Sequence, residues 1–352
     1  MIALLILILI LGILIFVHEL GHYLAAKWAG VYVHEFALGM GPKIFSFRRK
    51  NDPTLYSLRA FPIGGFCAMA GEVEEDEKDP KIKIKKDQYM CNKTKWQRFV
   101  ILFSGVFLNF VLAFLLLFMQ SLIWGHREQR SYIGFVPEGL PAAEAGIREG
   151  DRVLSINGHR INNWDRLQTV LHLRNDSGIF TFVVLTPEGE ETTHEVTPNV
   201  EVDEDGNERN VFGIGSSPTM HRGFGASLSF AWSRLWTTIS TMVFTIGSLI
   251  TGNLSLSALS GPVGMHGIVG DSARVGISAL IALTAFLSIN LGVINLLPFP
   301  AVDGGRIVFI GIEAITGKKV NQKFENIMHL VGFALLMLLM LYVTVMDIFR
   351  LF

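Results

Sequence analysis

The chain has 352 residues, of which 50% are hydrophobic and 17% are charged, and its mean hydropathy is +0.41. This composition indicates a membrane protein rather than a soluble one. The net charge of −1 hides a strong segregation of charge along the chain, which orients the protein below. Two cysteines, Cys67 and Cys91, are too few for a disulfide scaffold, and we expect both to be reduced.

The first expected element is a transmembrane helix over residues 1–26. A bilayer core of about 30 Å needs roughly 20 apolar residues in a helix. The apolar run from Met1 to Val17 is uninterrupted, and the first lysine is Lys27. A secretory signal peptide is the alternative, but no basic residue precedes the apolar run, as such a signal requires.

This first span contains the motif His18-Glu19-Leu20-Gly21-His22, which has the pattern H-E-x-x-H. Two histidines four residues apart share one face of a helix and can bind one zinc ion, while Glu19 beside them can take a proton from water. A polar helix end at the membrane surface is the plain alternative. Inserting a charged side chain into the bilayer centre costs about 2.5–3.5 kcal/mol on insertion scales, so such residues are usually functional. The motif therefore indicates a functional site inside the membrane.

The loop over residues 27–98 is basic, and the second expected span, residues 99–124, has no charge. The loop contains fourteen lysines and arginines, counted from Lys27 to Arg98. Because such residues are enriched on the cytosolic side of membrane proteins, we expect this loop in the cytosol.

The region from Gly125 to Gly225 is acidic, with no lysine and with nine arginines against sixteen carboxylates, a balance of −7. We therefore expect it outside the cytosol, together with both chain termini. Residues 199–275 are interpreted as a linker and a helix. The stretch 226–250 is rich in Ser and Thr, and we expect it to lie at the outer membrane interface rather than to span.

The third and fourth expected spans are residues 276–297 and 326–348, joined by a metal-ligand loop over 298–325. A catalytic zinc takes three protein ligands, so the two histidines need a partner from elsewhere. Asp303 follows the third span in the sequence N-L-L-P-F-P-A-V-D-G-G. The prolines end the helix and the glycines permit a tight turn, so that this carboxylate can reach back to the first span.

Three other interpretations of the ligand set remain open at this point. Asp303 is also placed where a helix N-cap would be, ahead of Gly304. Glu313 and His329 are weaker candidates for the third ligand. A fifth span over 226–250 would put Asp303 and His22 on opposite membrane faces and exclude the shared site.

Taken together, H-E-L-G-H in the first span and N-L-L-P-F-P-A-V-D-G-G after the third resemble the site-2 protease family, the metalloproteases of regulated intramembrane proteolysis. Residues 35–47 and 56–72 resemble the membrane-associated β-hairpin of that family, and 96–109 the start of its second span. Ser260-Gly-Pro-Val-Gly264 also matches a segment of the family.

The resemblance implies that Zn²⁺ is bound by His18, His22 and Asp303, with Glu19 as the general base. It further implies that Asn290 and Asn295 hydrogen-bond the substrate or the developing oxyanion. An interhelical hydrogen bond is the plain alternative for each asparagine.

Residues 131–198 resemble a PDZ domain, through P-A-A-E-A-G-I-R-E-G-D-R-V-L-S-I-N-G from Pro141 to Gly158. PDZ domains bind an extended peptide by adding it to a sheet edge. Residues 132–136 precede this motif, and we expect the peptide-binding strand there.

The expected fold is therefore a multi-span α-helical membrane protein with four transmembrane helices, a cytosolic-side β-hairpin and an extracytoplasmic PDZ domain. The expected activity is that of a zinc endopeptidase in the inner or plasma membrane that cleaves transmembrane segments, for example of anti-sigma factors or remnant signal peptides. Peptide termini at the PDZ domain and the lipid bilayer are further expected partners, and nucleic acid is not. A catalytically silent PDZ scaffold is the alternative function.

Overall fold

The structure is a computed structural model that describes residues 2–71, 84–127, 130–173, 178–202, 208–217, 219–252 and 261–349. Ser260 and parts of the basic loop 27–98 and of the acidic region from Gly125 to Gly225 lie outside these residues. The chain divides into two compact units, which are taken in turn: Met1–Leu117 with Ser255–Phe352, and Phe118–Leu254.

Four helices of the described chain are long and apolar enough to cross a membrane, as expected for a multi-span membrane protein. They are α1 (Ile2–Trp28), α2 (Lys95–Trp124), α7 (Ile277–Leu296) and α9 (Gln322–Phe349). The helix α5 (Phe224–Ile250) has 27 residues but does not belong to this set. Its Ser, Thr and Gly residues and Arg234 dilute the apolar side chains that a span requires.

The helix α1 has one inward stripe and one lipid-type face. Its buried residues recur every three or four positions, which is the spacing of one helix face: Leu7, Ile10, Leu14, His18, Gly21, His22, Ala25 and Ala26. Large apolar side chains such as Leu5 and Leu9, 64% and 63% exposed, point the other way. Both histidines of the motif therefore face the interior of the unit.

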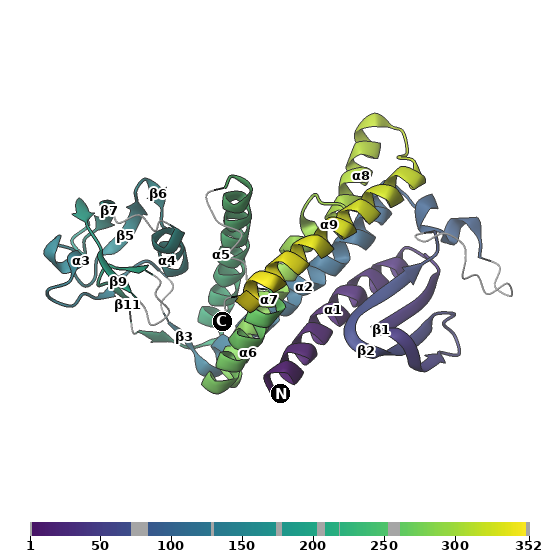
Figure 1. Ribbon diagram of the computed structural model, residues 1–352, viewed down its shortest axis with the longest axis horizontal. Coiled ribbons are helices and arrows are strands. Elements are labelled where there is room, and N and C mark those ends of the chain that lie inside the picture. Colours follow the sequence, from purple (N-terminus) through teal and green to yellow (C-terminus); the bar gives the residue numbers. More distant parts are fainter. Residues whose placement is uncertain are drawn as a thin grey trace. The chain divides into compact units, whose positions relative to one another are not determined.

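Two long strands, β1 (Val33–Arg48) and β2 (Leu55–Met69), form a bent sheet beside α1 (Figure 1). Because both strands bend, residues 35–38 pair with 65–68 on one side and with 55–58 on the other. Residues 55–58 pair in turn with 45–48. The strand segment at the α1 side is thus 65–68, and the segment 55–58 is enclosed between two neighbours.

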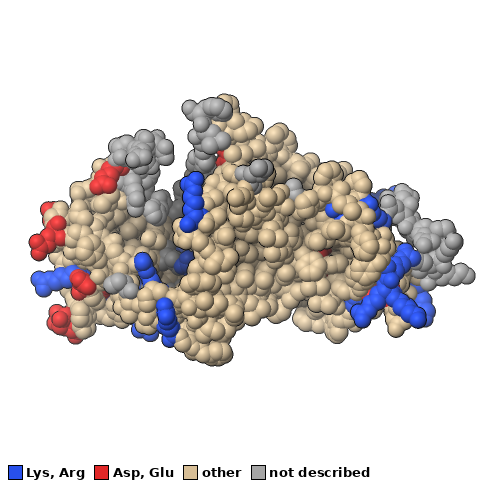
Figure 2. All heavy atoms as spheres, turned by 90° about the horizontal axis from the view of Figure 1, so that it is seen from below, with Lys and Arg blue, Asp and Glu red and all other residues tan. Residues whose placement is uncertain are grey.

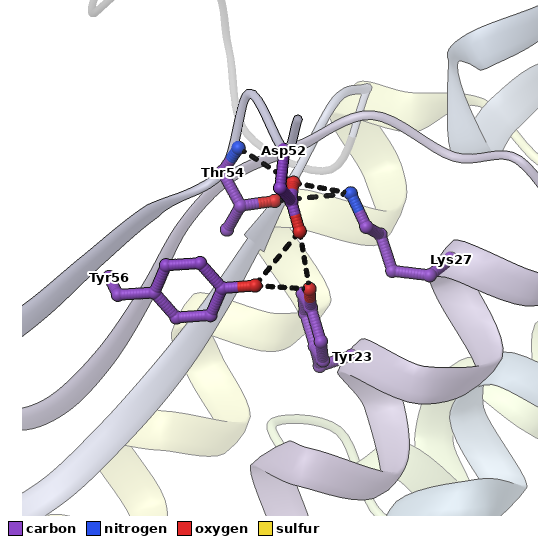
Figure 3. A network of polar contacts seen from close by, with 5 residues as sticks. All are labelled: Tyr23, Lys27, Asp52, Thr54 and Tyr56. Atoms are coloured by element: carbon purple, nitrogen blue, oxygen red, sulfur yellow. Dashed lines mark hydrogen bonds and ion pairs between the residues drawn. The ribbon is translucent and has the colours of Figure 1, made fainter. Parts of the chain in front are cut away.

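The turn between β1 and β2 is tied to α1 by a polar network around Asp52 (Figure 3). Oδ1 of Asp52 accepts hydrogen bonds from Lys27 Nζ at 2.6 Å and from the backbone N–H of Thr54 at 2.9 Å. Oδ2 accepts from the hydroxyls of Tyr23 and Tyr56, both at 2.8 Å. Since Tyr23 and Lys27 lie on α1, this network fixes the sheet to the helix that carries the metal motif.

The remainder of the first unit consists of η1 (Lys86–Gln88), η2 (Met90–Asn92), α6 (Pro262–Val275) and α8 (Asp303–Thr316). Asp347 of α9 is buried, and its Oδ2 accepts the backbone N–H of Gly264 at 2.9 Å. This bond satisfies one of the free N–H groups at the start of α6. Within the matched Ser260–Gly264 segment, Gly264 thus anchors the end of the last span.

The second unit contains a four-stranded sheet with the order β6-β5-β7-β8 and several shorter elements. The sheet strands are β5 (Arg152–Ile156), β6 (His159–Arg160), β7 (Phe180–Leu185) and β8 (Glu191–Val196). The short helices are α3 (Pro141–Glu144) and α4 (Trp164–Leu173). The remaining strands are β3 (His126–Arg127), β4 (Ile133–Phe135), β9 (Asn199–Val202), β10 (Glu208–Val211), β11 (Gly215–Ser216) and β12 (Met220–His221).

This domain continues beyond the boundary at 198 that the sequence suggested. Phe212 is buried in the same core as Ile133 and Phe180, and β11 pairs with β4. On its other side, β4 shares backbone hydrogen bonds with residues 150 and 151. The strand expected to receive a peptide, 132–136, therefore has a neighbour on each side.

The helix α5 packs within the second unit. Asn163 donates to Thr237 Oγ1 at 2.6 Å, and the Arg166 guanidinium lies 4.2 Å from the ring centre of Phe244. Near the start of α5, Ser121 donates to Ser227 at 2.9 Å. These contacts hold α5 against α4 and against the end of α2.

The exposed charges follow the segregation seen in the sequence (Figure 2). Lys and Arg gather over the β1–β2 sheet, where Lys43, Arg48, Arg49 and Lys50 are exposed. Asp and Glu gather over the strands of the second unit, where Glu138, Glu149, Glu188, Glu190 and Glu191 are exposed.

Candidate metal centre

His18 and His22 bring their Nε2 atoms to within 3.1 Å of each other on the inward face of α1. Both residues are buried, with 7% and 6% of their surface exposed. One helical turn separates them, so the two imidazoles project from the same side of the helix. The H-E-x-x-H spacing thus gives two converging nitrogen donors.

Asp303 is the first residue of α8, and its carboxylate turns back to these histidines. Its Oδ2 lies 3.0 Å from His18 Nε2 and 3.2 Å from His22 Nε2. Neither contact has hydrogen-bond geometry, and this buried oxygen has no hydrogen-bond partner among the described residues. The N-cap of α8 is Val302, without a side-chain cap, so the N-cap role for Asp303 does not apply.

The two glycines after Asp303 are required by close packing. A Cβ on Gly304 would lie 2.1 Å from the carbonyl oxygen of Leu297, and one on Gly305 would lie 2.4 Å from that of Phe299. Neither glycine has a positive φ angle. The glycines therefore let α8 begin directly against the end of α7, which delivers the carboxylate to α1.

The donor set fits a tetrahedral zinc ion. Zinc binds imidazole nitrogen and carboxylate oxygen at about 2.0–2.2 Å, which places ligand atoms about 3.3 Å apart. The three donor atoms of His18, His22 and Asp303 are separated by 3.0, 3.1 and 3.2 Å. Among the described residues these three form the group that could hold a metal ion. A buried carboxylate oxygen without a donor, facing two imidazoles, is an arrangement that a cation would satisfy.

The other nitrogen of each imidazole is held by α2. His22 Nδ1 lies 2.8 Å from the carbonyl oxygen of Ile101, and His18 Nδ1 lies 3.1 Å from Asn109 Nδ2. The backbone of Asn109 accepts in turn from Ser288 Oγ of α7 at 2.8 Å. Such outer contacts fix the orientation of a ligating imidazole.

Two glycines make room for the imidazoles. A Cβ on Gly105 of α2 would lie 2.6 Å from His22 Nε2 and 2.9 Å from His18 Cε1. On the α1 side, a Cβ on Gly21 would lie 2.3 Å from the carbonyl oxygen of Ser104. The glycine inside the motif therefore lets α1 and α2 touch, and Gly105 leaves room for both imidazoles.

Glu19 lies between the two histidines in sequence and is partly exposed. A Cβ on Gly65 would lie 3.6 Å from Glu19 Cγ and 2.9 Å from the carbonyl oxygen of Ala37. The β2 segment 65–68 thus runs directly beside the proposed base.

The two rival ligands have other partners. Glu313 is buried and forms an ion pair with Arg98 at 2.6 Å, which joins α8 to the start of α2. His329 Nδ1 accepts the backbone N–H of Ala301 at 2.9 Å. Neither belongs to the donor cluster found in the described chain.

Asn290 and Asn295 both lie on α7, and neither belongs to the donor cluster found in the described residues. Asn290 Oδ1 is buried and has no hydrogen-bond partner among the described residues. The structure thus brings together His18, His22 and Asp303, with Glu19 alongside, and leaves both asparagines on the neighbouring helix.

Sequence reasoning missed Gly105, Asn109 and Ser288. A usable signal existed for Asn109, because it is one of the few polar residues within the second span. Gly105 gave no such signal, since a glycine in an apolar span is common and its neighbours are set by tertiary packing.

The chain matches the model of peptidase family M50 over residues 6–339. It is 34% identical to the zinc metalloprotease RasP of Bacillus licheniformis, with 98% of each chain covered. It is 33% identical to the regulator of sigma-W protease RasP of Bacillus subtilis, again over 98% of each chain. A putative zinc metalloprotease of Fusobacterium nucleatum, FN1322, is 37% identical over 99% of each chain.

These matches extend over nearly the whole chain and include the spans that carry the donor cluster. The chain belongs to peptidase family M50 and is a multi-pass membrane zinc metalloprotease of the site-2 type.

Proposed function

We propose that this enzyme hydrolyses peptide bonds within transmembrane segments, with zinc held by His18, His22 and Asp303 and with Glu19 as the general base. The observation that carries the proposal is the convergence of three donor atoms, two from the membrane-spanning helix α1 and one from the first residue of α8. When bound there, zinc would polarise the scissile carbonyl and lower the pKa of water toward about 7.

The neighbours of the histidines support this assignment. A ligand that binds through Nε2 keeps its proton on Nδ1, and the carbonyl oxygen of Ile101 is placed to accept that proton from His22. For His18 the corresponding acceptor is the Asn109 amide, once its oxygen faces the ring. Asn109 Oδ1 is buried without a partner among the described residues, so this orientation gives it one.

Glu19 acts next to a strand that suits an extended substrate. A transmembrane helix satisfies its peptide groups internally, so a substrate must unwind locally before hydrolysis. The segment 65–68 pairs with 35–38 on one side and lies beside Glu19. We assign it as the edge to which the unwound segment adds by backbone hydrogen bonds.

Asn290 and Asn295 are assigned to the substrate or the developing oxyanion. The buried Oδ1 of Asn290, which has no partner in the described structure, supports a role for this residue in binding an N–H group.

The proposed orientation follows the charges. The β1–β2 sheet, with its exposed Lys43, Arg48, Arg49 and Lys50, lies on the cytosolic side, as does the turn that carries Asp303. Both termini and the acidic domain over 131–216 lie outside, and α5 lies at the outer interface. The enzyme then resides in the plasma membrane.

The outer domain is assigned as a PDZ domain that receives peptide termini. Because β4 has a neighbour on each side, a peptide does not add to 132–136 without displacing one of them. Because the Bacillus subtilis relative is named a regulator of sigma-W, we propose anti-sigma factors as one substrate class of this enzyme.

The test is cleavage of a model transmembrane substrate by purified Glu19→Gln. We expect retained zinc and a rate lower by about 10²–10⁴, the usual effect of losing a general base. Cleavage at the rate of the natural enzyme would refute the role of Glu19. A scaffold without catalysis would show no cleavage by either protein.

A further inference from the structure

The turn that delivers Asp303 contains an unfavourable backbone conformation. Ala301 has φ = 83°, in the left-handed region, and it is one of two non-glycine residues with positive φ in the described chain. The other, Asn157, is of a residue type that tolerates this region. A residue with a Cβ adopts it only when surrounding contacts outweigh the cost.

The last span supplies these contacts. Nδ1 of His329 on α9 accepts the N–H of Ala301 at 2.9 Å. One turn further, Gly332 is buried, and a Cβ there would lie 2.4 Å from the carbonyl oxygen of Pro300. Residues three apart share a helix face, so α9 presents one acceptor and one flat surface to the turn.

Ala301, which α9 contacts in this way, lies two residues before Asp303, the third donor. From Ala301 the chain passes Val302, the N-cap of α8, and reaches Asp303, whose Oδ2 lies 3.0 Å from His18 Nε2. The orientation of the peptide group at Ala301 thus decides where α8 begins and where its first carboxylate points.

We infer that His329 is a positioning residue of the zinc site: it holds Ala301 in the left-handed conformation so that Asp303 meets the two imidazoles. The inference rests on the proposed ligand role of Asp303. His329 is an ionisable residue inside the fourth span, and its role is then to position the turn before Asp303 rather than to bind metal, catalyse or pack.

The experiment measures zinc affinity of the full chain in detergent by competition with a chromophoric chelator. His329→Leu removes the acceptor and should weaken zinc binding on the order of tenfold, the cost of an unsupported left-handed residue. His329→Asn, whose amide oxygen can replace Nδ1 as the acceptor, should retain most of the affinity. His266→Leu, at an exposed histidine of α6, is the matched control and should change nothing.

The double variant Ala301→Gly with His329→Leu decides whether the effect passes through Ala301. Glycine adopts positive φ without steric cost, so this change should restore most of the lost affinity. Ala301→Val leaves α9 untouched and should weaken zinc binding by itself, because a β-branched residue is poorly tolerated at positive φ. This last variant applies even if His329→Leu does not fold.

The contrary results distinguish failure of this inference from failure of the proposed metal site. Unchanged affinity in His329→Leu or in Ala301→Val would overturn the inference, and so would failure of Ala301→Gly to rescue. Loss of zinc in His329→Asn as severe as in His329→Leu would make the imidazole itself necessary, against a positioning role. Full zinc binding by Asp303→Ala would instead refute the proposed metal site, whatever the His329 variants show.

Discussion

Asp52 and Asp303 both contact side chains of α1, at neighbouring levels of the helix, and their surroundings differ in one respect. Asp52 accepts four hydrogen bonds, two on each oxygen, from Lys27, Thr54, Tyr23 and Tyr56 (Figure 3). These fill the acceptor positions of a carboxylate. Asp303 directs an oxygen without a hydrogen-bond donor at two imidazole nitrogens.

The difference separates a structural carboxylate from the proposed ligand. A buried charge is stable only when it is compensated. The hydrogen bonds and the ion pair with Lys27 compensate the carboxylate of Asp52, whereas Oδ2 of Asp303 can still bind a cation. The two clusters join on α1, where Tyr23 directly follows His22. The Asp52 network fixes the sheet to α1 and therefore places segment 65–68 beside Glu19.

The largest effect is expected for the metal carboxylate. Asp303→Asn should reduce zinc affinity by about a hundredfold or more, since loss of an outer contact alone costs 10–100-fold. The matched change Glu313→Gln should leave zinc bound, because that carboxylate pairs with Arg98. Zinc content of the purified proteins checks both. Equal zinc loss in the two variants would indicate a general effect on α8.

A smaller effect is expected at Gly105, which packs against the imidazoles. Gly105→Ala places a methyl group at 2.6 Å from His22 Nε2, so both imidazoles must shift, and zinc affinity should fall by about 10–100-fold. Gly311→Ala on α8, where a Cβ meets nothing within 4 Å, is the control and should bind zinc normally. Chelator competition measures the difference. Normal affinity in Gly105→Ala would show that α2 does not shape the site.

The smallest effect on zinc, and the clearest effect on stability, is expected at Asp52. Asp52→Asn should keep zinc and lower the free energy of unfolding by about 1–3 kcal/mol, the range for lost hydrogen bonds to a charged group. Thermal unfolding in detergent, with zinc content measured in parallel, checks this. Zinc loss as large as in Asp303→Asn would remove the distinction between the two aspartates.

The same network predicts a pH dependence. Burial alone would raise the pKa of Asp52, but the hydrogen bonds from Lys27 and Thr54 outweigh it and hold the pKa well below its usual range. A lowered pKa adds stability above the unfolded value of about 3.9, and this is lost as pH falls below it. Asp52→Asn should therefore flatten the fall in stability below about pH 4. Asp271→Asn, at an exposed carboxylate, should not.

Residues that act through local spacing were predictable from the sequence. His18, Glu19 and His22 follow from the helical repeat, and the four spans follow from length and hydropathy. Asp303 was predictable because prolines precede it and glycines follow it. The contact of the turn with α9 was not predictable, since His329 lies 28 residues after Ala301 and its sequence context suggested only a rival ligand.

Features that depend on distant pairing were predicted less well. The boundary at 198 was too early because β11 returns to β4 across most of the domain, and no local pattern marks that pairing. The bends of β1 and β2, which pair 65–68 with 35–38 and place Gly65 beside Glu19, likewise have no local sequence signal. In both cases tertiary contacts set the register, which alternating hydrophobicity alone does not fix.

The most direct test of the metal site is zinc-edge X-ray absorption of Asp303→Cys. If residue 303 is a ligand, its sulfur binds zinc at about 2.3 Å and adds a scattering shell distinct from the nitrogen and oxygen shell at about 2.0–2.2 Å. The natural enzyme and Glu313→Cys should both lack that shell. A zinc-loaded Asp303→Cys protein with nitrogen and oxygen neighbours alone would contradict ligation by Asp303, and with it the site built from α1 and α8.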